Sequence, residues 1–183
     1  MGCDIHLMVE MREKPSLGRK STWCGAGFVG EFSVRIYGMF ARMAKVRDYY
    51  GDLCKVQFEP RGLPNDITFW AQLIFYMRVT AISEAIEWGS GYCTKEDAER
   101  WVSQGLSEWY DESHMLLTNP DHHSHSWLTT QELRQCFDDC FKKKDGTYYP
   151  YSDYAEWLGL VSFCEGVESD GKHECRVVFA FDN

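Results

Sequence analysis

The two ends of the chain carry the feature that most constrains its fold, an alternation of side chains with the two-residue period of a β-strand. Residues 3–11 are apolar at every odd position, and Asp4, His6 and Glu10 share the opposite face. Residues 176–181 carry apolar side chains on both faces, which is typical of an interior strand covered on both sides. Because strands at chain ends are commonly tied into a sheet, we predict that these two strands are neighbours.

The sequence between the two strands has helical spacing of apolar residues and several capping residues. These signals predict helices at about residues 37–46, 67–88, 94–109, 129–144 and 152–164, with loops at 14–30, 47–66 and 110–126 and a short strand at 32–34. The predicted fold class is therefore α+β, a small mostly antiparallel sheet packed by several helices. A length of 183 residues fits one domain, residues 1–183, with a helical insertion at about 67–112.

The charge balance argues against a protein that binds phosphate groups through a basic surface. The net charge is −9, and the only local basic group is Arg42, Lys45 and Arg47. Contact with nucleic acid is therefore expected to be indirect or local, and an acidic protein is steered towards basic partners. No apolar run approaches the ~20 residues that span a bilayer. Together with the missing secretory signal, this predicts a cytoplasmic protein without a membrane partner.

Asp4 and His6 form the first group of side chains that could carry chemistry. Two residues apart on one strand face, they could reach a single cation, as in metallohydrolases. The alternative is a hydrogen-bonded Asp–His pair on the sheet surface, which the sequence favours because such neighbours lie close together.

A second candidate is the histidine-rich stretch at residues 121–125. His123 and His125 share a face if the chain is extended, and with Asp4 and His6 they would complete a four-ligand site for zinc or another transition metal. In that case Asp121 would act as the base on metal-bound water. The alternative is a solvated loop before the next helix, for which no cofactor is expected.

The eight cysteines are expected to be reduced, because no secretory signal is present and most have apolar neighbours. Cys136 and Cys140 lie one helical turn apart and could join a zinc site, although core packing beside Phe137 and Phe141 is favoured. Motifs for serine hydrolases, phosphate-binding loops, zinc proteases and dinucleotide binding are missing, and no catalytic residue is assigned. The glycine pattern at residues 25–30 lacks the strand and helix that a dinucleotide site needs.

Acidic and aromatic residues in the middle of the chain form the third candidate, a surface for a protein partner. Aromatic side chains anchor protein interfaces, and 28 of them exceed what one small core commonly needs. The predicted partner-binding residues are Glu96, Asp97, Glu99, Trp101, Trp109 and Tyr110.

Four segments resemble a family of small phage and prophage proteins without an assigned activity. They are Met1 to His6, Arg61 to Pro64, His123 to Thr129 and the terminal Arg176-Val177-Val178-Phe179-Ala180-Phe181-Asp182-Asn183. The length and acidity are also similar to those of type II anti-CRISPR proteins, which inhibit Cas9. This resemblance implies a protein of the bacterial host cytoplasm that occludes a basic nuclease. The alternatives are a metal-dependent hydrolase and a phage accessory protein with structural contacts.

Overall fold

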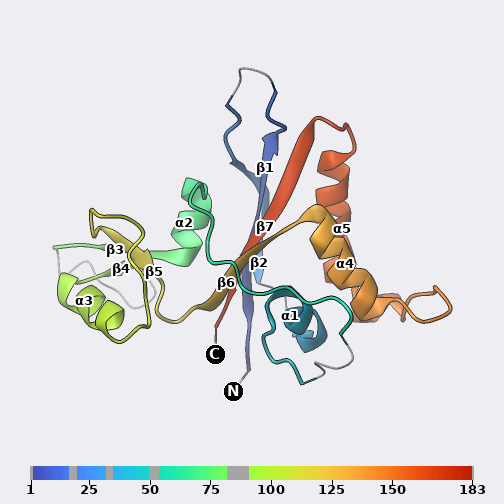
Figure 1. Ribbon diagram of the computed structural model, residues 1–183, viewed down its shortest axis with the longest axis horizontal. Helices are drawn as coiled ribbons and strands as arrows, with labels where there is room; N and C mark the ends of the chain where they lie inside the picture. Colours follow the sequence, from blue (N-terminus) through green and yellow to red (C-terminus); the bar gives the residue numbers. More distant parts are fainter. Residues whose placement is uncertain (1, 17–19, 32–34, 50–53, 82–90, 183) are drawn as a thin grey trace.

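A computed structural model describes residues 2–16, 20–31, 35–49, 54–81 and 91–182 (Figure 1). Its main sheet has four antiparallel strands in the order β2-β1-β7-β6. These strands are β1 (Ile5–Glu13), β2 (Cys24–Glu31), β6 (His123–Thr129) and β7 (His173–Phe181). The α+β class is thus confirmed, and both terminal strands lie in this sheet, paired with Ile5 opposite Phe181.

Helices α1 (Tyr37–Ala44), α4 (Thr130–Phe141) and α5 (Ala155–Glu168) cover one face of this sheet (Figure 1). The odd-numbered apolar side chains of β1 meet them in the main core, as the alternation predicts. Its largest buried side chains include Trp157, Phe40 and Phe179. Thr129 begins α4 with a capping box, in which its hydroxyl accepts from the Glu132 N–H and the Glu132 carboxylate accepts from the Thr129 N–H.

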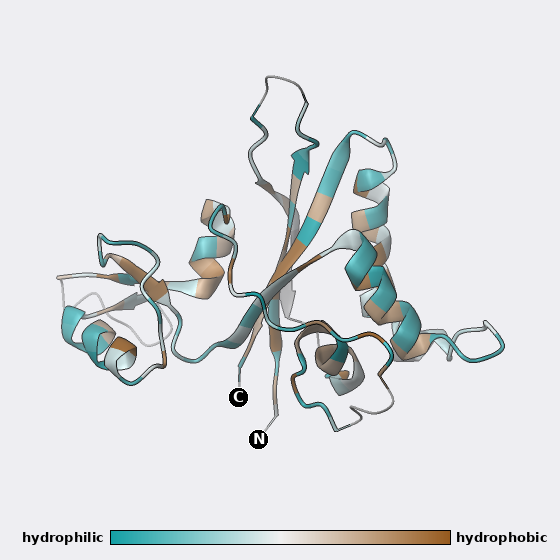
Figure 2. Ribbon diagram, viewed as in Figure 1, coloured by the Kyte–Doolittle hydropathy of each residue, from teal (hydrophilic) through white to brown (hydrophobic). Residues whose placement is uncertain are grey.

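The opposite face of the sheet carries a smaller apolar cluster beneath α2 (Phe69–Phe75). Met8 of β1 and Val178 and Ala180 of β7 pack there against buried residues of α2, such as Phe75. β7 is therefore an interior strand covered on both sides, as its two apolar faces predict. Figure 2 shows the resulting hydrophobic colour along the middle of β1 and β7.

A second sheet of three short strands lies beside α2, where the sequence predicts only helices and a loop. It has the order β4-β3-β5 and contains β3 (Tyr76–Val79), β4 (Tyr92–Cys93) and β5 (Leu116–Thr118), next to α3 (Lys95–Ser103). The predicted helix from residue 67 is wrong over Tyr76–Val79, because the chain becomes extended at Tyr76 and pairs with β5. Over so short a run, the spacing of the apolar side chains fits both the helical and the strand period. Pairing with β5, whose Leu117 is buried, favours the strand.

Other boundaries differ in smaller ways. The predicted loop at 14–30 holds β2, and the predicted loop at 110–126 holds β5 and the start of β6. α3 and α4 end before the predicted 109 and 144, and α5 runs beyond 164 to Glu168. The predicted strand at 32–34 and the stretch 82–90 lie outside the described residues.

Candidate functional site

Asp4, His6 and Asp182 meet where the paired terminal strands end. The Asp182 carboxylate accepts a hydrogen bond from the Asp4 N–H at 2.9 Å, and its second oxygen lies 3.1 Å from His6 Nε2. Burial acts to raise the pKa of Asp182, but these hydrogen bonds and the histidine charges outweigh it, so the pKa is lowered. His6 is thus in hydrogen-bond contact with Asp182, whereas the sequence alternative paired it with Asp4.

The Asp4 side chain points to a different partner, Arg35. Arg35 donates from Nε to one Asp4 carboxylate oxygen at 2.5 Å and from Nη2 to the other at 2.6 Å. This bidentate pair uses both oxygens of Asp4 and raises the pKa of the guanidinium. Asp4 and His6 are therefore neighbours that serve two separate ion pairs.

Four histidines gather near this end of the sheet, and we call His6, His122, His123 and His125 the histidine cluster. The rings of His6 and His122 stack with centroids 4.5 Å apart, and His122 and His125 are 6.2 Å apart. Burial, with a smaller contribution from neighbouring histidines, lowers the pKa of His122 and of His125 to about 4. Both rings are consequently neutral at pH 7.

A bulge in β6 sets the positions of these rings. The pairing with β7 slips by one residue between His123 and Ser126, and Ser124 has a left-handed φ of 52°. Ser124 Oγ lies 3.0 Å from His123 Nδ1. β-bulges next to functional sites commonly redirect a side chain, which makes this strained residue relevant to the histidine cluster.

The predicted metal ligands do not form one ligand set. Within the parts of the chain that the structure describes, no group of three or more His, Cys, Asp or Glu side chains is placed to hold a metal ion. Asp4 is bound to Arg35, and His6 to Asp182. The zinc role suggested for Cys136 and Cys140 meets the same obstacle. Both pack with the main core, and burial raises the pKa of Cys140 to about 11.

Two pockets flank the turn at Asp121 and His122. The first has a volume of about 390 Å³ and is lined by Gly62, Leu63, Gly105, Leu106, Ser107, Glu108, Thr118, Pro120, Asp121, His122, His123 and His125. The second, of about 620 Å³, lies between α2, the second sheet and α3 and includes His6, Leu73, Tyr92, Asp97, Trp101 and Leu106 in its lining. The histidine cluster thus borders both.

The acidic residues predicted to bind a partner lie on α3, and two of them are ion-paired within that helix. Asp97 binds Arg100 at 2.6 Å, and Glu99 lies 3.7 Å from Lys95. Asp97 also accepts a hydrogen bond from the hydroxyl of Thr94, the N-cap residue of α3. Glu96 is exposed. The local charge of α3 is consequently weaker than its acidic residues alone suggest.

The three predicted partner-binding aromatics are half-buried. Trp101 and Trp109 pack against the small cluster of Cys93, Ala98 and Leu117. Tyr110 stacks edge-on with Tyr76 at 5.0 Å, and its hydroxyl donates to the Asn65 carbonyl. Trp101 and Trp109 therefore support the cluster beside α3, and Tyr110 supports the cluster beneath α2, while each keeps part of its side chain at the surface.

Helix α2 carries large apolar side chains that are more than half exposed and that were not predicted from the sequence. Phe69, Trp70 and Leu73 are 57%, 62% and 54% exposed, whereas Ala71 and Phe75 on the other side of the helix are fully buried. We call the exposed trio the α2 face. The sequence did not indicate this exposed side, because the long predicted helix had apolar residues all round. The helix ends at Phe75, and this end determines which of its sides packs on the sheet.

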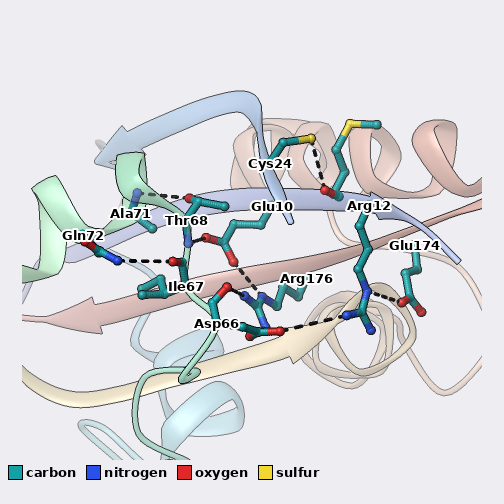
Figure 3. Close-up of polar contacts among 11 residues, drawn as sticks. Glu10, Arg12, Cys24, Asp66, Ile67, Thr68, Ala71, Gln72, Glu174 and Arg176 are labelled. Atoms are coloured by element: carbon teal, nitrogen blue, oxygen red, sulfur yellow. Dashed lines mark hydrogen bonds and ion pairs between the residues drawn. The ribbon is translucent and has the colours of Figure 1, made fainter. Parts of the chain in front are cut away.

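A network of charged residues, missed by the sequence analysis, lies under α2 (Figure 3). Glu10 is fully buried and accepts hydrogen bonds from Arg176 Nε at 2.6 Å and from the Thr68 N–H at 2.7 Å. Arg176 also donates to the carboxylate and the carbonyl of Asp66. Thr68 is the N-cap residue of α2, so the network fixes the start of that helix to the sheet.

The same network continues across the two terminal strands. Arg12 donates to Glu174 at 2.6 Å, and Trp23 lies against both guanidinium groups, 4.3 Å from Arg12 and 4.1 Å from Arg176. We call Glu10, Arg12, Asp66, Glu174 and Arg176 the charge network. The strand register pairs Glu10 with Arg176 and Arg12 with Glu174. Knowledge of this register would have predicted the charge network, because it places opposite charges directly across from each other.

Arg61 connects the segment at 61–64 to β6 and α4. Its guanidinium forms two hydrogen bonds to Glu132, at 2.9 and 2.6 Å, and lies over the Trp127 ring. The next residue, Gly62, donates its N–H to the His125 carbonyl at 2.9 Å. Segment 61–64 is thus joined to β6 of the main sheet and to α4.

All eight cysteines carry free thiols. Among the described residues, no helix has the length and apolar character needed to cross a membrane. No protein-family model, curated protein or solved structure matches this chain.

Proposed function

We propose that this protein binds a basic protein partner through the α2 face and the adjoining pocket, and that the partner is a host defence nuclease of the Cas9 type. The observation that carries the proposal is the α2 face itself. Three large apolar side chains more than half exposed on a seven-residue helix are costly in water unless a partner covers them.

The surroundings of the α2 face extend this surface towards α3. Leu73 borders the pocket of about 620 Å³ together with Tyr92 and Leu106, which are also exposed. Asp97 and Trp101 of α3 line the same pocket. The helix with the predicted acidic residues and the helix with the exposed aromatics therefore both contribute to the lining of this pocket.

The net charge of the whole molecule is a stronger argument for a basic partner than the local charge of α3. The net charge of −9 speeds the approach of a basic protein and is screened by salt. Apolar anchors such as Trp70 hold the complex once it forms, because they lose contact with water. Binding without covalent chemistry is sufficient for such an inhibitor, which would act by stoichiometric occlusion.

The test measures binding to purified Cas9 with its guide RNA, together with DNA cleavage, for wild type and paired variants. We expect Trp70→Ser with Leu73→Ser to weaken binding at least about tenfold, the effect of losing a ~1.4 kcal/mol anchor. The matched control is Tyr149→Ser with Tyr151→Ser, since these side chains are 49% and 63% exposed elsewhere. Charge reversal of Glu96, Asp97 and Glu99 should mainly slow association.

Two results would contradict the proposal. If wild-type protein in large excess neither binds Cas9 nor changes its cleavage, the proposed target is wrong. If binding occurs but both double variants bind equally well, the interface does not include the α2 face. Circular dichroism of each variant verifies that the fold is retained.

A further inference from the structure

The pocket of about 390 Å³ beside the histidine cluster has an unusual concentration of buried polar atoms without partners. Among the described residues, Ser107 Oγ, His122 Nδ1, His123 Nε2 and His125 Nε2 are buried and have no hydrogen-bond partner. All four residues line this one pocket. A buried polar atom without a partner costs roughly 1–3 kcal/mol, so native proteins rarely gather several without a reason.

The charge of the pocket lining limits the ligands that could satisfy these atoms. His122 and His125 are neutral at pH 7, because their pKa values are lowered to about 4. The carboxylates of Glu108 and Asp121 belong to the same lining. An anion would be repelled by this combination. A cation rich in N–H groups would find the two carboxylates at the surface of the pocket, and a turn of the imidazole and serine side chains would bring their buried polar atoms to it.

The backbone around the pocket shows that the arrangement is maintained against strain. Ser124 adopts its left-handed φ of 52° inside the β6 bulge, between two of the lining histidines. Gly62, with φ of 74°, comes from the distant 61–64 segment and bonds to the His125 carbonyl. A non-glycine residue in this region costs on the order of 1 kcal/mol, and such strain clusters at ligand sites.

We propose that this pocket binds a guanidinium group. Five N–H donors in a planar fork match a set of acceptors spread over imidazole, hydroxyl and carboxylate groups. In the complex proposed above, on which this step of the inference rests, the group is an arginine side chain of the basic partner. Asp121 and His122 border both pockets, so an arginine here would lie beside a partner seated on the α2 face.

The experiment uses two small probes and the imidazole NMR signals of the whole protein. N-acetyl-arginine amide should shift the signals of His122 and His125 in a saturable way. N-acetyl-citrulline amide has nearly the same shape without the charge, and should bind at least about tenfold more weakly. Equal shifts with both probes, or no shift with either at high millimolar concentration, would overturn the proposal.

Variants then locate the site without disturbing the fold. Asp121→Asn removes one exposed carboxylate from the lining and should weaken the arginine probe roughly fivefold or more. Glu112→Gln is the matched control, an exposed acid that is not part of the lining, and should have no effect. Equal binding of the arginine probe by Asp121→Asn and wild type would place the guanidinium elsewhere and contradict the assignment.

Measuring Cas9 binding with the same variants separates this inference from the proposed function. If Asp121→Asn weakens the arginine probe and also weakens Cas9 binding, the guanidinium belongs to the partner. If it weakens only the small probe, the pocket binds a free guanidinium compound, and the partner arginine is ruled out. Failure of the α2 variants to affect Cas9 would reject the protein interface without changing the probe result.

Discussion

The charge network and the histidine cluster both lie on the α2 side of the main sheet, but they differ in how completely their buried polar atoms are hydrogen-bonded. In the charge network, Glu10 and Arg176 are almost fully buried and their charged groups are hydrogen-bonded. In the histidine cluster, three rings each keep a buried nitrogen that has no partner in the described part of the chain. His6 and Glu10 lie on the same face of β1, so the strand supports both arrangements. A satisfied network fixes the fold, whereas an unsatisfied one has capacity left for a ligand.

The largest effect is expected from breaking the charge network. Glu10→Gln removes one of the two carboxylates that face Arg176 and should lower the free energy of unfolding by about 3 kcal/mol, because the buried guanidinium keeps only the largely exposed Asp66 as a counterion. Urea denaturation monitored by tryptophan fluorescence measures the change. Replacing both residues, Glu10→Leu with Arg176→Met, should recover much of the loss. A single variant as stable as wild type would show that the network does not support the fold.

The histidine cluster should instead reveal itself through pH. Folding lowers the pKa of His122 and His125 to about 4 from the usual 6.5, so the unfolded chain binds more protons between these values. Stability should therefore fall as pH drops from about 6.5 to 4, by on the order of 3 kcal/mol for the half-buried pair together.

Urea denaturation at several pH values, compared between wild type and His125→Gln, isolates this contribution. The variant should lose part of the slope between pH 6.5 and 4. Identical slopes would mean that His125 titrates normally in the folded protein.

A smaller loss is expected at the junction of the chain ends. Asp182→Asn keeps an acceptor for the Asp4 N–H but removes the charge that faces His6, which should cost about 1 kcal/mol at pH 7. Because folding lowers the pKa of Asp182, its contribution exists above the unfolded pKa of about 4 and disappears as pH falls through the folded value. In thermal unfolding, the difference between the variant and wild type should thus be largest at pH 7 and shrink as the pH is lowered below about 4.

The smallest effect is expected where a buried polar atom already lacks a partner. Ser107→Ala removes such a hydroxyl and should leave stability unchanged or raise it by up to about 1 kcal/mol. The same variant should weaken the arginine probe. A clear loss of stability in differential scanning calorimetry would mean that Ser107 supports the fold.

The comparison also shows how far sequence reasoning reached at each site. It placed His6 and Glu10 on one face of β1, because a two-residue period needs no knowledge of distant contacts. It placed the terminal strands side by side because strands at chain ends are commonly tied into a sheet. It did not predict the register between β1 and β7, and without that register Arg176 could not be identified as the partner of Glu10. For the histidine stretch it proposed a metal site with Asp4, but Arg35 lies 31 positions along the chain and gave no local signal that it would occupy that carboxylate.

The sequence by itself determined the α+β class, the two terminal strands and the caps of α3 and α4. These follow from periodicity and local hydrogen bonding, which act within a few residues. Only the tertiary structure decided that the apolar run after residue 67 becomes a strand at Tyr76 and that the α2 face is exposed. It also decided that three histidine nitrogens are buried without a partner among the described residues. Each of these depends on which distant segment packs against the site, since burial is a property of the whole fold.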